Sequence, residues 1–206
     1  MTPEDRLQTV RRYAERLQRL GPDVQALGWR DAEQQALRFD VLTGMLPDLA
    51  GARILDVGCG FGDLHEYLCA RGIDAVYTGC DISADVLCVA RARHAGLAFE
   101  ERDIVDTPYP DGSFDYVCIS GIFNHRITNN QAFMERTLSA AFRAARKGAA
   151  ANMMTDHVDY REDHLYYFNP ESVLAFCRTL SRHVALRHDY PLYEFTVAVR
   201  RLTLEP

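Results

Sequence analysis

From residue 52 onward, short apolar runs alternate with amphipathic stretches that carry helical spacing. A run of about five apolar residues suits a buried strand, and an amphipathic stretch between two such runs suits a crossover helix. We expect strands at 53–57, 75–80, 97–101, 114–120 and 149–154, with helices at 63–71, 83–93 and 130–146. This order predicts a mostly parallel sheet with helices on both faces.

The two ends of the chain follow other patterns. Helical spacing at 4–20 and 31–46, broken by Gly21-Pro22, predicts two helices before the sheet. After a helix at 170–180, alternating strands at 183–188 and 194–200 predict an antiparallel β-hairpin. The expected fold is therefore α/β: a doubly wound, seven-stranded, mostly parallel sheet with a C-terminal hairpin and N-terminal cap helices. Ligands of such sheets bind beyond the carboxyl ends of the strands.

Length and composition limit the number of domains and the compartment. The 206 residues suffice for one globular unit, which we divide into a helical cap at 1–50 and a main domain at 51–206. The six cysteines form no Cys-x-x-Cys pair, which favours reduced core thiols over disulfides or zinc. The first residues lack the charged and then apolar pattern of a leader, and no apolar stretch approaches ~18 residues. We therefore expect a cytoplasmic protein without a membrane partner.

Charge argues against nucleic acid as the partner. There are 23 basic and 29 acidic side chains, a net charge of −6. Binding to a bare phosphate backbone requires clustered excess positive charge. A local basic groove stays open, because the chain has one lysine and otherwise only arginines as its strongly basic residues.

A glycine loop is the strongest chemical signal. The apolar run that ends at Val57 leads into Gly58, Gly60 and Gly62, and then into a predicted helix that begins with Asp63. Glycine lets a backbone turn tightly and approach a ligand closely. The nicotinamide fingerprint Gly-x-Gly-x-x-Gly requires glycine where Asp63 stands, and a carboxylate there would repel a pyrophosphate. The loop suits a positively charged ligand that has no phosphate.

The segment Asp56-x-Gly58-x-Gly60-x-Gly62 resembles the first motif of the class I S-adenosylmethionine-dependent methyltransferases. The resemblance implies S-adenosylmethionine as the cofactor, with S-adenosylhomocysteine as the product. It also implies that the loop lies against the methionine part of the cofactor. By the same resemblance, Asp56 and Asp63 would hold its ammonium group.

Acids after the next two strands support the same cofactor. Asp81 and Ile82 follow the second strand, where doubly wound folds place an acid that accepts from both ribose hydroxyls. Asp103 and Ile104 follow the third strand and look like the family's adenine motif, in which the acid accepts from the exocyclic amine and the apolar residue packs on the ring. Ser120 ends the fourth strand, where the family's next motif lies against the cofactor.

The N-terminal segment offers further candidates. Many small-molecule members of the family cover the cofactor with an N-terminal helix. Arg38 or Arg30 would then form a forked pair with the cofactor carboxylate, and Trp29 would line the substrate cavity. Core packing for Trp29 and surface ion pairs for the arginines are the structural alternatives.

Substrate residues are expected in two loops. The loop after the fourth strand contains Asn124 and His125, and it lacks the Asp/Asn-Pro-Pro-aromatic signature of nucleic-acid amino-methyltransferases. The loop at 155–170 is too polar for core and too aromatic for a solvated linker, so it predicts a pocket wall that includes Tyr160 and Tyr166. No spacing in it indicates metal ligands.

Two histidines of the second loop are candidate general bases. An imidazole takes a proton from a hydroxyl or thiol near neutral pH, which suggests His157 and His164. The predicted activity is methyl transfer to an O, N or S atom of a small molecule by in-line displacement. An RNA methyltransferase and a noncatalytic S-adenosylmethionine-binding module are the alternatives.

Overall fold

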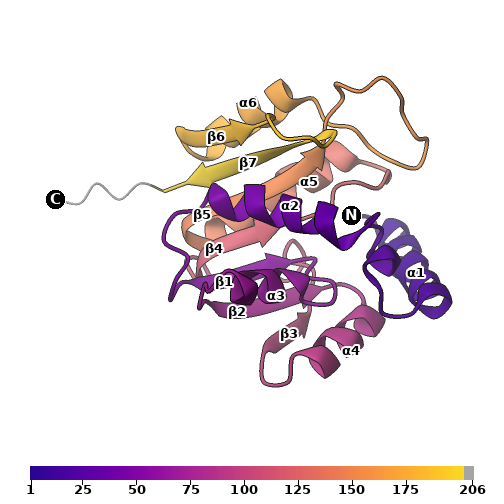
Figure 1. Ribbon diagram of the computed structural model, residues 1–206. Coiled ribbons are helices and arrows are strands. Elements are labelled where there is room, and N and C mark those ends of the chain that lie inside the picture. The colour runs from indigo at the N-terminus through magenta and orange to yellow at the C-terminus, as the bar shows by residue number, and fades with distance from the viewer. Residues whose placement is uncertain (202–206) are drawn as a thin grey trace.

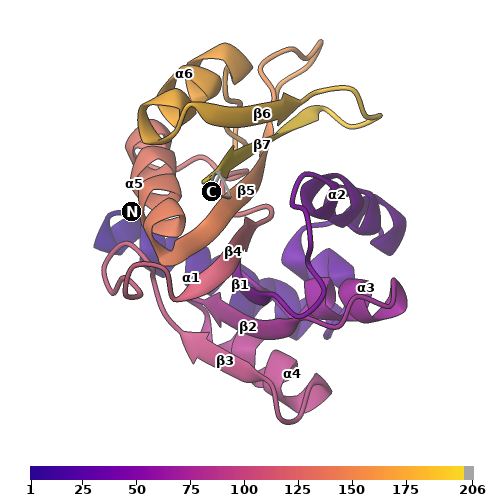
Figure 2. The same ribbon diagram turned by 90° about the vertical axis from the view of Figure 1, so that its left-hand side faces the viewer.

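A sheet of seven strands runs through the computed structural model, which describes residues 1–201, and helices cover both of its faces (Figures 1 and 2). The strand order is β3-β2-β1-β4-β5-β7-β6, with β7 antiparallel to its neighbours β5 and β6. The strands are β1 (Arg53–Val57), β2 (Val76–Asp81), β3 (Ala98–Glu101), β4 (Phe114–Ile119), β5 (Ala145–Met154), β6 (His183–Arg187) and β7 (Glu194–Arg200). This architecture confirms the predicted fold class.

Alternation along the strands divides the core into two layers. In β1, Leu55 and Val57 belong to one hydrophobic cluster, and Ile54, directly before Leu55, belongs to the other. Successive side chains of a strand point to opposite faces of the sheet, so a continuous apolar run is buried on both. The helices are α1 (Pro3–Leu20), the 3-10 turn η1 (Val24–Leu27), α2 (Ala32–Gly44), α3 (Asp63–Ala70), α4 (Ala84–Arg93), α5 (Asn130–Ala144) and α6 (Pro170–Leu180).

The layers hold different helices. α5 and α6 pack on one face, and α2 and α3 pack on the other, as Figure 2 shows. Phe39 and Leu42 of α2 share a cluster with residues of the sheet. The predicted boundary at residue 50 falls between α2 and β1, and the division of the chain at that point stays a prediction. Residues 202–206 of the predicted main domain lie outside the described residues.

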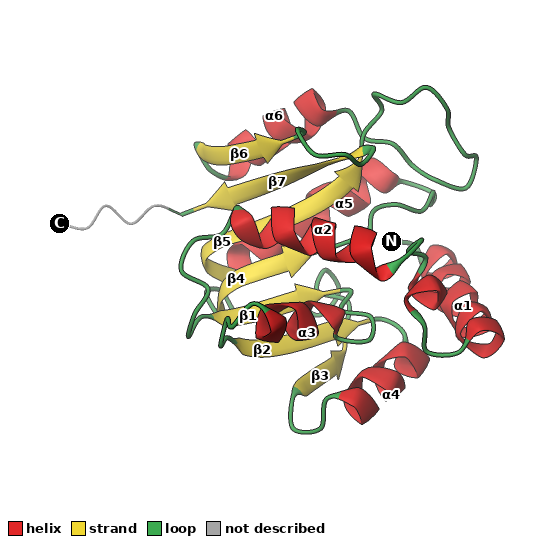
Figure 3. Ribbon diagram, in the orientation of Figure 1, coloured by secondary structure: helices red, strands yellow, loops and turns green. Residues whose placement is uncertain are grey.

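α1 lies beside the carboxyl ends of the parallel strands (Figure 3). Thr2 and Asp5 form a capping box at its start, and Pro3 occupies its first position. Asp5 Oδ1 also accepts from the backbone N–H and the hydroxyl of Thr128, at 3.1 and 3.0 Å. These bonds tie the first helix to the loop before α5.

The predicted junction between the helix before β5 and β5 itself is wrong. We expected a helix to 146 and a strand from 149, whereas α5 ends at Ala144 and β5 begins at Ala145. The Ala-Ala-Arg-Lys segment has high helix propensity, but Ala145 pairs with Phe114 of β4, and tertiary pairing overrides a weak local preference. Within residues 1–201, no helix combines the length and the apolar character that crossing a membrane requires.

Candidate functional site

The glycine loop follows β1 and is fastened to β2. The backbone N–H groups of Gly58 and Cys59 both donate to the carbonyl of Cys80, at 2.8 and 3.0 Å. Gly58 and Gly60 have φ values of 71° and 57°, in the left-handed region that favours glycine. The sequence Gly-Cys-Gly therefore fixes a turn whose backbone stands at the carboxyl edge of the sheet.

The same glycines leave room for close neighbours. A Cβ at Gly58 would lie 2.1 Å from Cγ2 of Ile122, and one at Gly60 would lie 2.8 Å from Cδ1 of Leu27. Both distances are shorter than real carbon contacts, so an alanine at either position would displace the loop or its neighbour.

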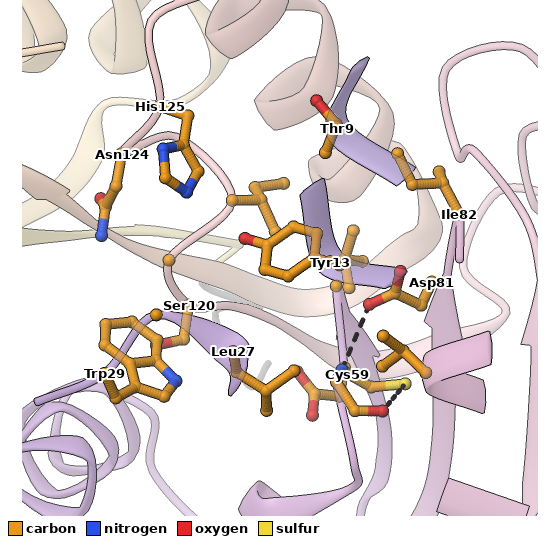
Figure 4. Close-up of a pocket in the computed structure, with 18 of the residues that line it drawn as sticks. Thr9, Tyr13, Leu27, Trp29, Cys59, Asp81, Ile82, Ser120, Asn124 and His125 are labelled. Atoms are coloured by element: carbon orange, nitrogen blue, oxygen red, sulfur yellow. Dashed lines mark hydrogen bonds between the residues drawn. The ribbon is translucent and has the colours of Figure 1, made fainter. Parts of the chain in front are cut away.

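A cavity of about 320 Å³ opens beside this loop, and Figure 4 shows part of its wall. Its lining includes residues of α1, α2, α4 and α5, of the ends of β1, β2, β5 and β7, and of the loops that follow β1 to β5. The predicted site residues that line it are Trp29, Arg38, Asp56, Gly58, Gly60, Asp81, Ile82, Asp103, Ile104, Ser120, Asn124 and His125.

Asp56 is the most buried of the three aspartates that line the cavity. It is 4% exposed and accepts a hydrogen bond of 2.7 Å from the hydroxyl of Tyr77. Burial raises the pKa of Asp56 to about 7, although the bond from Tyr77 acts in the other direction. A cation placed in the cavity would favour its ionised form.

Asp81 closes the loop onto β2. Its carboxylate accepts from the backbone N–H of Gly60 at 3.2 Å and from that of Ser83 at 3.0 Å. Burial raises the pKa of the Asp81 carboxyl above its usual value, and the two hydrogen bonds offset only part of this increase. The side chain therefore both shapes the loop and faces the cavity.

Asp103 has one free carboxylate oxygen. Oδ1 accepts from the N–H of Val105 at 2.9 Å, whereas Oδ2 is buried and has no hydrogen-bond partner among residues 1–201. Buried polar atoms are nearly always paired, so this oxygen is available to a donor in the cavity.

An asparagine from β5 holds the end of β4. Asn152 Nδ2 donates to the hydroxyl of Ser120 at 3.0 Å, and Asn152 Oδ1 accepts from the N–H of Gly121 at 2.9 Å. Asn152 is 1% exposed. The sequence gives no signal for this role, because a single polar residue within an apolar strand does not reveal its partner.

The guanidinium of Arg38 already has a carboxylate partner. Arg38 Nε donates to Glu194 Oε1 and Oε2 at 2.9 and 3.0 Å, and both residues are buried. The guanidinium also lies 4.5 Å from the ring centroid of Trp29. Arg30, the alternative to Arg38, lines the cavity but is exposed and pairs with Asp31.

Two predicted residues of the glycine loop lie away from the cavity. Gly62 has a φ of 86° at the start of α3, and a Cβ there would lie 2.7 Å from the ring of His94. The carboxylate of Asp63 accepts from Gln35 Nε2 at 2.8 Å and pairs with Arg93 at 3.3 Å. These contacts account for a glycine at 62 and an aspartate at 63 without a contact to a ligand in the cavity.

The loop after β5 does not bring its predicted site residues to the cavity, because it extends beyond the sheet (Figure 1). The side chains of His157 and His164 are 55% and 61% exposed, and Tyr160 is 76% exposed. Tyr166 turns inward but packs on Phe168, with ring centroids 4.7 Å apart. The loop reaches the cavity through Leu165 instead.

Asn124 and His125 present polar atoms with no protein partner. Asn124 Oδ1 and His125 Nδ1 are buried and unpaired among the described residues. Burial, together with the nearby charges of Arg12 and Arg16, lowers the pKa of His125 to about 4. Its imidazole is therefore neutral at neutral pH.

α1 contributes residues that the sequence did not single out. Thr9 and Tyr13 lie one turn apart and both line the cavity. Figure 4 shows Tyr13 between the side of the cavity with Asp81 and the side with His125. Burial, and next the charge of Asp81, raises the pKa of Tyr13 to about 12. In the sequence, Tyr13 is one member of an apolar helical stripe, which carries no functional signal.

Comparison with known proteins gives one family. Residues 54–148 match the family model described as "Methyltransferase domain". The chain is 41% identical over 155 residues to a Mycobacterium tuberculosis protein named "Putative methyltransferase Rv1506c", covering 72% of this chain and 92% of that protein. It is 43% identical over 77 residues to a Fatty-acid O-methyltransferase of Mycolicibacterium smegmatis, covering 36% of this chain and 28% of that protein.

Among solved structures, the fold is similar to that of magnesium protoporphyrin IX methyltransferase from Synechocystis with bound S-adenosylmethionine. The TM-score is 0.63 at 16% identity, and the match covers 82% of this chain and 80% of that one. At this identity the similarity concerns the fold alone.

Proposed function

Since this chain belongs to the class I S-adenosylmethionine-dependent methyltransferases, we propose that it methylates an oxygen, nitrogen or sulfur atom of a small molecule. One observation carries this proposal. The glycine loop, Asp56, Asp81 and Asp103 line the same cavity as Trp29, Asn124 and His125, so cofactor and acceptor would meet there. Its volume of about 320 Å³ falls at the lower end of the range typical of small-molecule sites.

The residues at the glycine loop fit the cofactor of the family. The buried carboxylate of Asp56 suits an ammonium group, and the free Oδ2 of Asp103 suits the exocyclic amine of adenine. Asp81 would accept from the ribose hydroxyls. Ile82 and Ile104 would contact the adenine ring from their positions in the cavity wall.

When bound, S-adenosylmethionine supplies a methyl group on a positively charged sulfur. An acceptor lone pair would attack the methyl carbon in line with the carbon–sulfur bond, and the sulfur would leave. The protein's part is to align the acceptor atom and to exclude water. Trp29, Asn124 and His125 are positioned for this, because they line the cavity beside Ser120 (Figure 4). Because the Arg38 guanidinium is already paired with the Glu194 carboxylate, we assign it to holding the Trp29 ring, over which it lies, in place.

An activity screen tests the proposal. The purified protein is incubated with S-adenosylmethionine and either a low-molecular-weight metabolite extract or total tRNA, and S-adenosylhomocysteine is measured. We expect product only with the metabolite extract, together with a metabolite whose mass increases by one methyl group. Turnover with tRNA alone would contradict a small-molecule acceptor.

A further inference from the structure

Two neighbouring polar atoms in the cavity have no partner in the protein. Asn124 Oδ1 and His125 Nδ1 are buried and unpaired within residues 1–201, and both residues line the cavity. Native structures leave few buried polar atoms without a hydrogen bond. The pair therefore indicates a place where a bound molecule supplies hydrogen-bonding groups.

The backbone around this pair is held by hydrogen bonds from other segments. Tyr166 N–H donates to the carbonyl of Asn124 at 2.9 Å, and Asn130 Nδ2 donates to the carbonyl of His125 at 2.7 Å. An isolated β-bridge also joins His125 to Leu165. The two side chains are thus presented from a fixed backbone, as a recognition site requires.

The charges of the cavity disfavour a cationic acceptor. Among the described residues, the carboxylates that line it are those of Asp56, Asp81, Asp103 and Glu194. The proposed function assigns the three aspartates to the cofactor, and Glu194 is paired with Arg38. A buried ammonium group on the acceptor would have no counter-charge, and burying an unpaired charge is costly.

The charged groups near His125 also disfavour a cationic acceptor. After the larger effect of burial, the charges of Arg12, His164 and Arg16 lower the pKa of His125, whereas a hydrogen bond with the backbone of His164 raises it. The Tyr13 ring lies 6.2 Å from the imidazole. The neutral ring can accept a proton, whereas the nearby arginines oppose a cationic ligand.

We propose that the methyl acceptor is an uncharged hydroxyl group on an apolar molecule, which Asn124 orients and from which His125 removes the proton. The oxygen lone pair forms the bond to the methyl carbon, the carbon–sulfur bond breaks with its electron pair left on sulfur, and the hydroxyl proton passes to His125 Nδ1. The remaining wall suits an apolar body, because it includes Ile122, Ile127 and Phe133.

A weak base is sufficient for this step. The hydroxyl proton becomes strongly acidic as its oxygen acquires the methyl group, so an imidazole that is hard to protonate in the free protein still accepts it. This inference rests on the proposed function, and it names the chemical class of the acceptor.

Binding of three probes that share one ring system tests the class of acceptor. With S-adenosylhomocysteine saturating at neutral pH, 2-naphthol, 2-naphthoate and 2-naphthylmethylamine are titrated calorimetrically. We expect the neutral naphthol to bind at least ~10-fold more tightly than the anion or the cation. Asn124→Ala and His125→Ala should each remove most of this preference and leave S-adenosylhomocysteine affinity unchanged. His157→Ala, whose side chain is 55% exposed, is the matched control and should behave like the wild type.

The rate of 2-naphthol methylation tests the role of His125. With cofactor saturating, we expect kcat to be flat between about pH 6 and 8, since an unperturbed imidazole would instead produce a rise near pH 6.5. His125→Ala should reduce kcat by ~10²-fold or more, and His157→Ala should not. Equal or tighter binding of naphthoate or the amine would overturn this inference alone. Failure of the wild type to bind S-adenosylhomocysteine would overturn the proposed function itself.

Discussion

Arg38 of α2 and Glu194 of β7 form a buried ion pair that joins the N-terminal helices to the last strand of the sheet. Arg38 Nε lies 2.9 and 3.0 Å from the two carboxylate oxygens, and NH1 donates to the carbonyl of Gln34 at 3.0 Å. The two side chains are 10% and 5% exposed. The pair closes one wall of the cavity and supports Trp29 above it.

Removing one member of this pair should be more damaging than removing both. Glu194→Leu leaves the Arg38 charge buried without a partner, and we expect a loss of about 3–5 kcal/mol in the free energy of unfolding. An Arg38→Met/Glu194→Leu double variant should recover much of that loss. Urea unfolding measures all three proteins. Asp189→Ala, which breaks an exposed pair with Arg187, is the control and should leave the midpoint nearly unchanged. A double variant at least as unstable as Glu194→Leu would contradict this expectation.

Gly121→Ala should disturb the site beyond the strain of its backbone. Gly121 has a φ of 83°, and an added Cβ would lie 2.5 Å from the Trp29 ring. Gly72→Ala is the matched control, with a φ of 69° and no atom within 4 Å of the new Cβ. We expect about 1 kcal/mol of destabilisation in the control and about 1–3 kcal/mol more in Gly121→Ala. Because Trp29 is the only tryptophan, its fluorescence should change in Gly121→Ala alone. Identical spectra and stabilities would show that the close approach is absent.

Local sequence patterns were sufficient to predict the sheet and the aspartates at the carboxyl edge of its strands. Asp56 lies in the first strand, while Asp81 and Asp103 come at or just after the next two, and parallel strands bring such residues to one edge. Local sequence patterns could not reveal that the Arg38 guanidinium pairs with the Glu194 carboxylate, because the two residues are 156 positions apart in the sequence. His157 was expected in the cavity, but no periodicity fixes the course of an irregular loop, and the structure leaves its side chain exposed.

Binding of S-adenosylhomocysteine should strengthen as pH rises through 7. Burial raises the pKa of Asp56 to about 7, so the folded protein holds this proton more tightly than the unfolded chain does. The contribution of Asp56 to stability is therefore present at acidic pH and declines as pH increases between about 4 and 7. The ammonium group of the ligand favours the carboxylate, so binding should release a proton in this range. Calorimetry in two buffers of different ionisation enthalpy measures that release. Asp56→Asn should abolish it, and an unchanged proton release in that variant would assign it to another group.

The free oxygen of Asp103 should contribute to cofactor affinity without contributing to the fold. Asp103→Asn keeps the oxygen that accepts from Val105 and replaces the unpaired Oδ2 by a donor. We expect S-adenosylhomocysteine to bind ~10-fold more weakly, with little change in thermal stability. Asp106→Asn, three residues along and exposed, is the control and should bind like the wild type. A loss of stability equal to the loss of affinity would indicate a structural role for Asp103.

Calorimetric titration with S-adenosylhomocysteine measures whether the cavity beside the glycine loop binds the cofactor of the family. The wild type, an Asp81→Ala variant and NADH as a control ligand form the set, because Asp81 is assigned to the ribose hydroxyls and the loop lacks the nicotinamide fingerprint. The assignment of this cavity to S-adenosylmethionine predicts saturable binding to the wild type, weakened by ~1–3 kcal/mol in Asp81→Ala, and no binding of NADH. Absence of S-adenosylhomocysteine binding, or equal affinity for NADH, would contradict it.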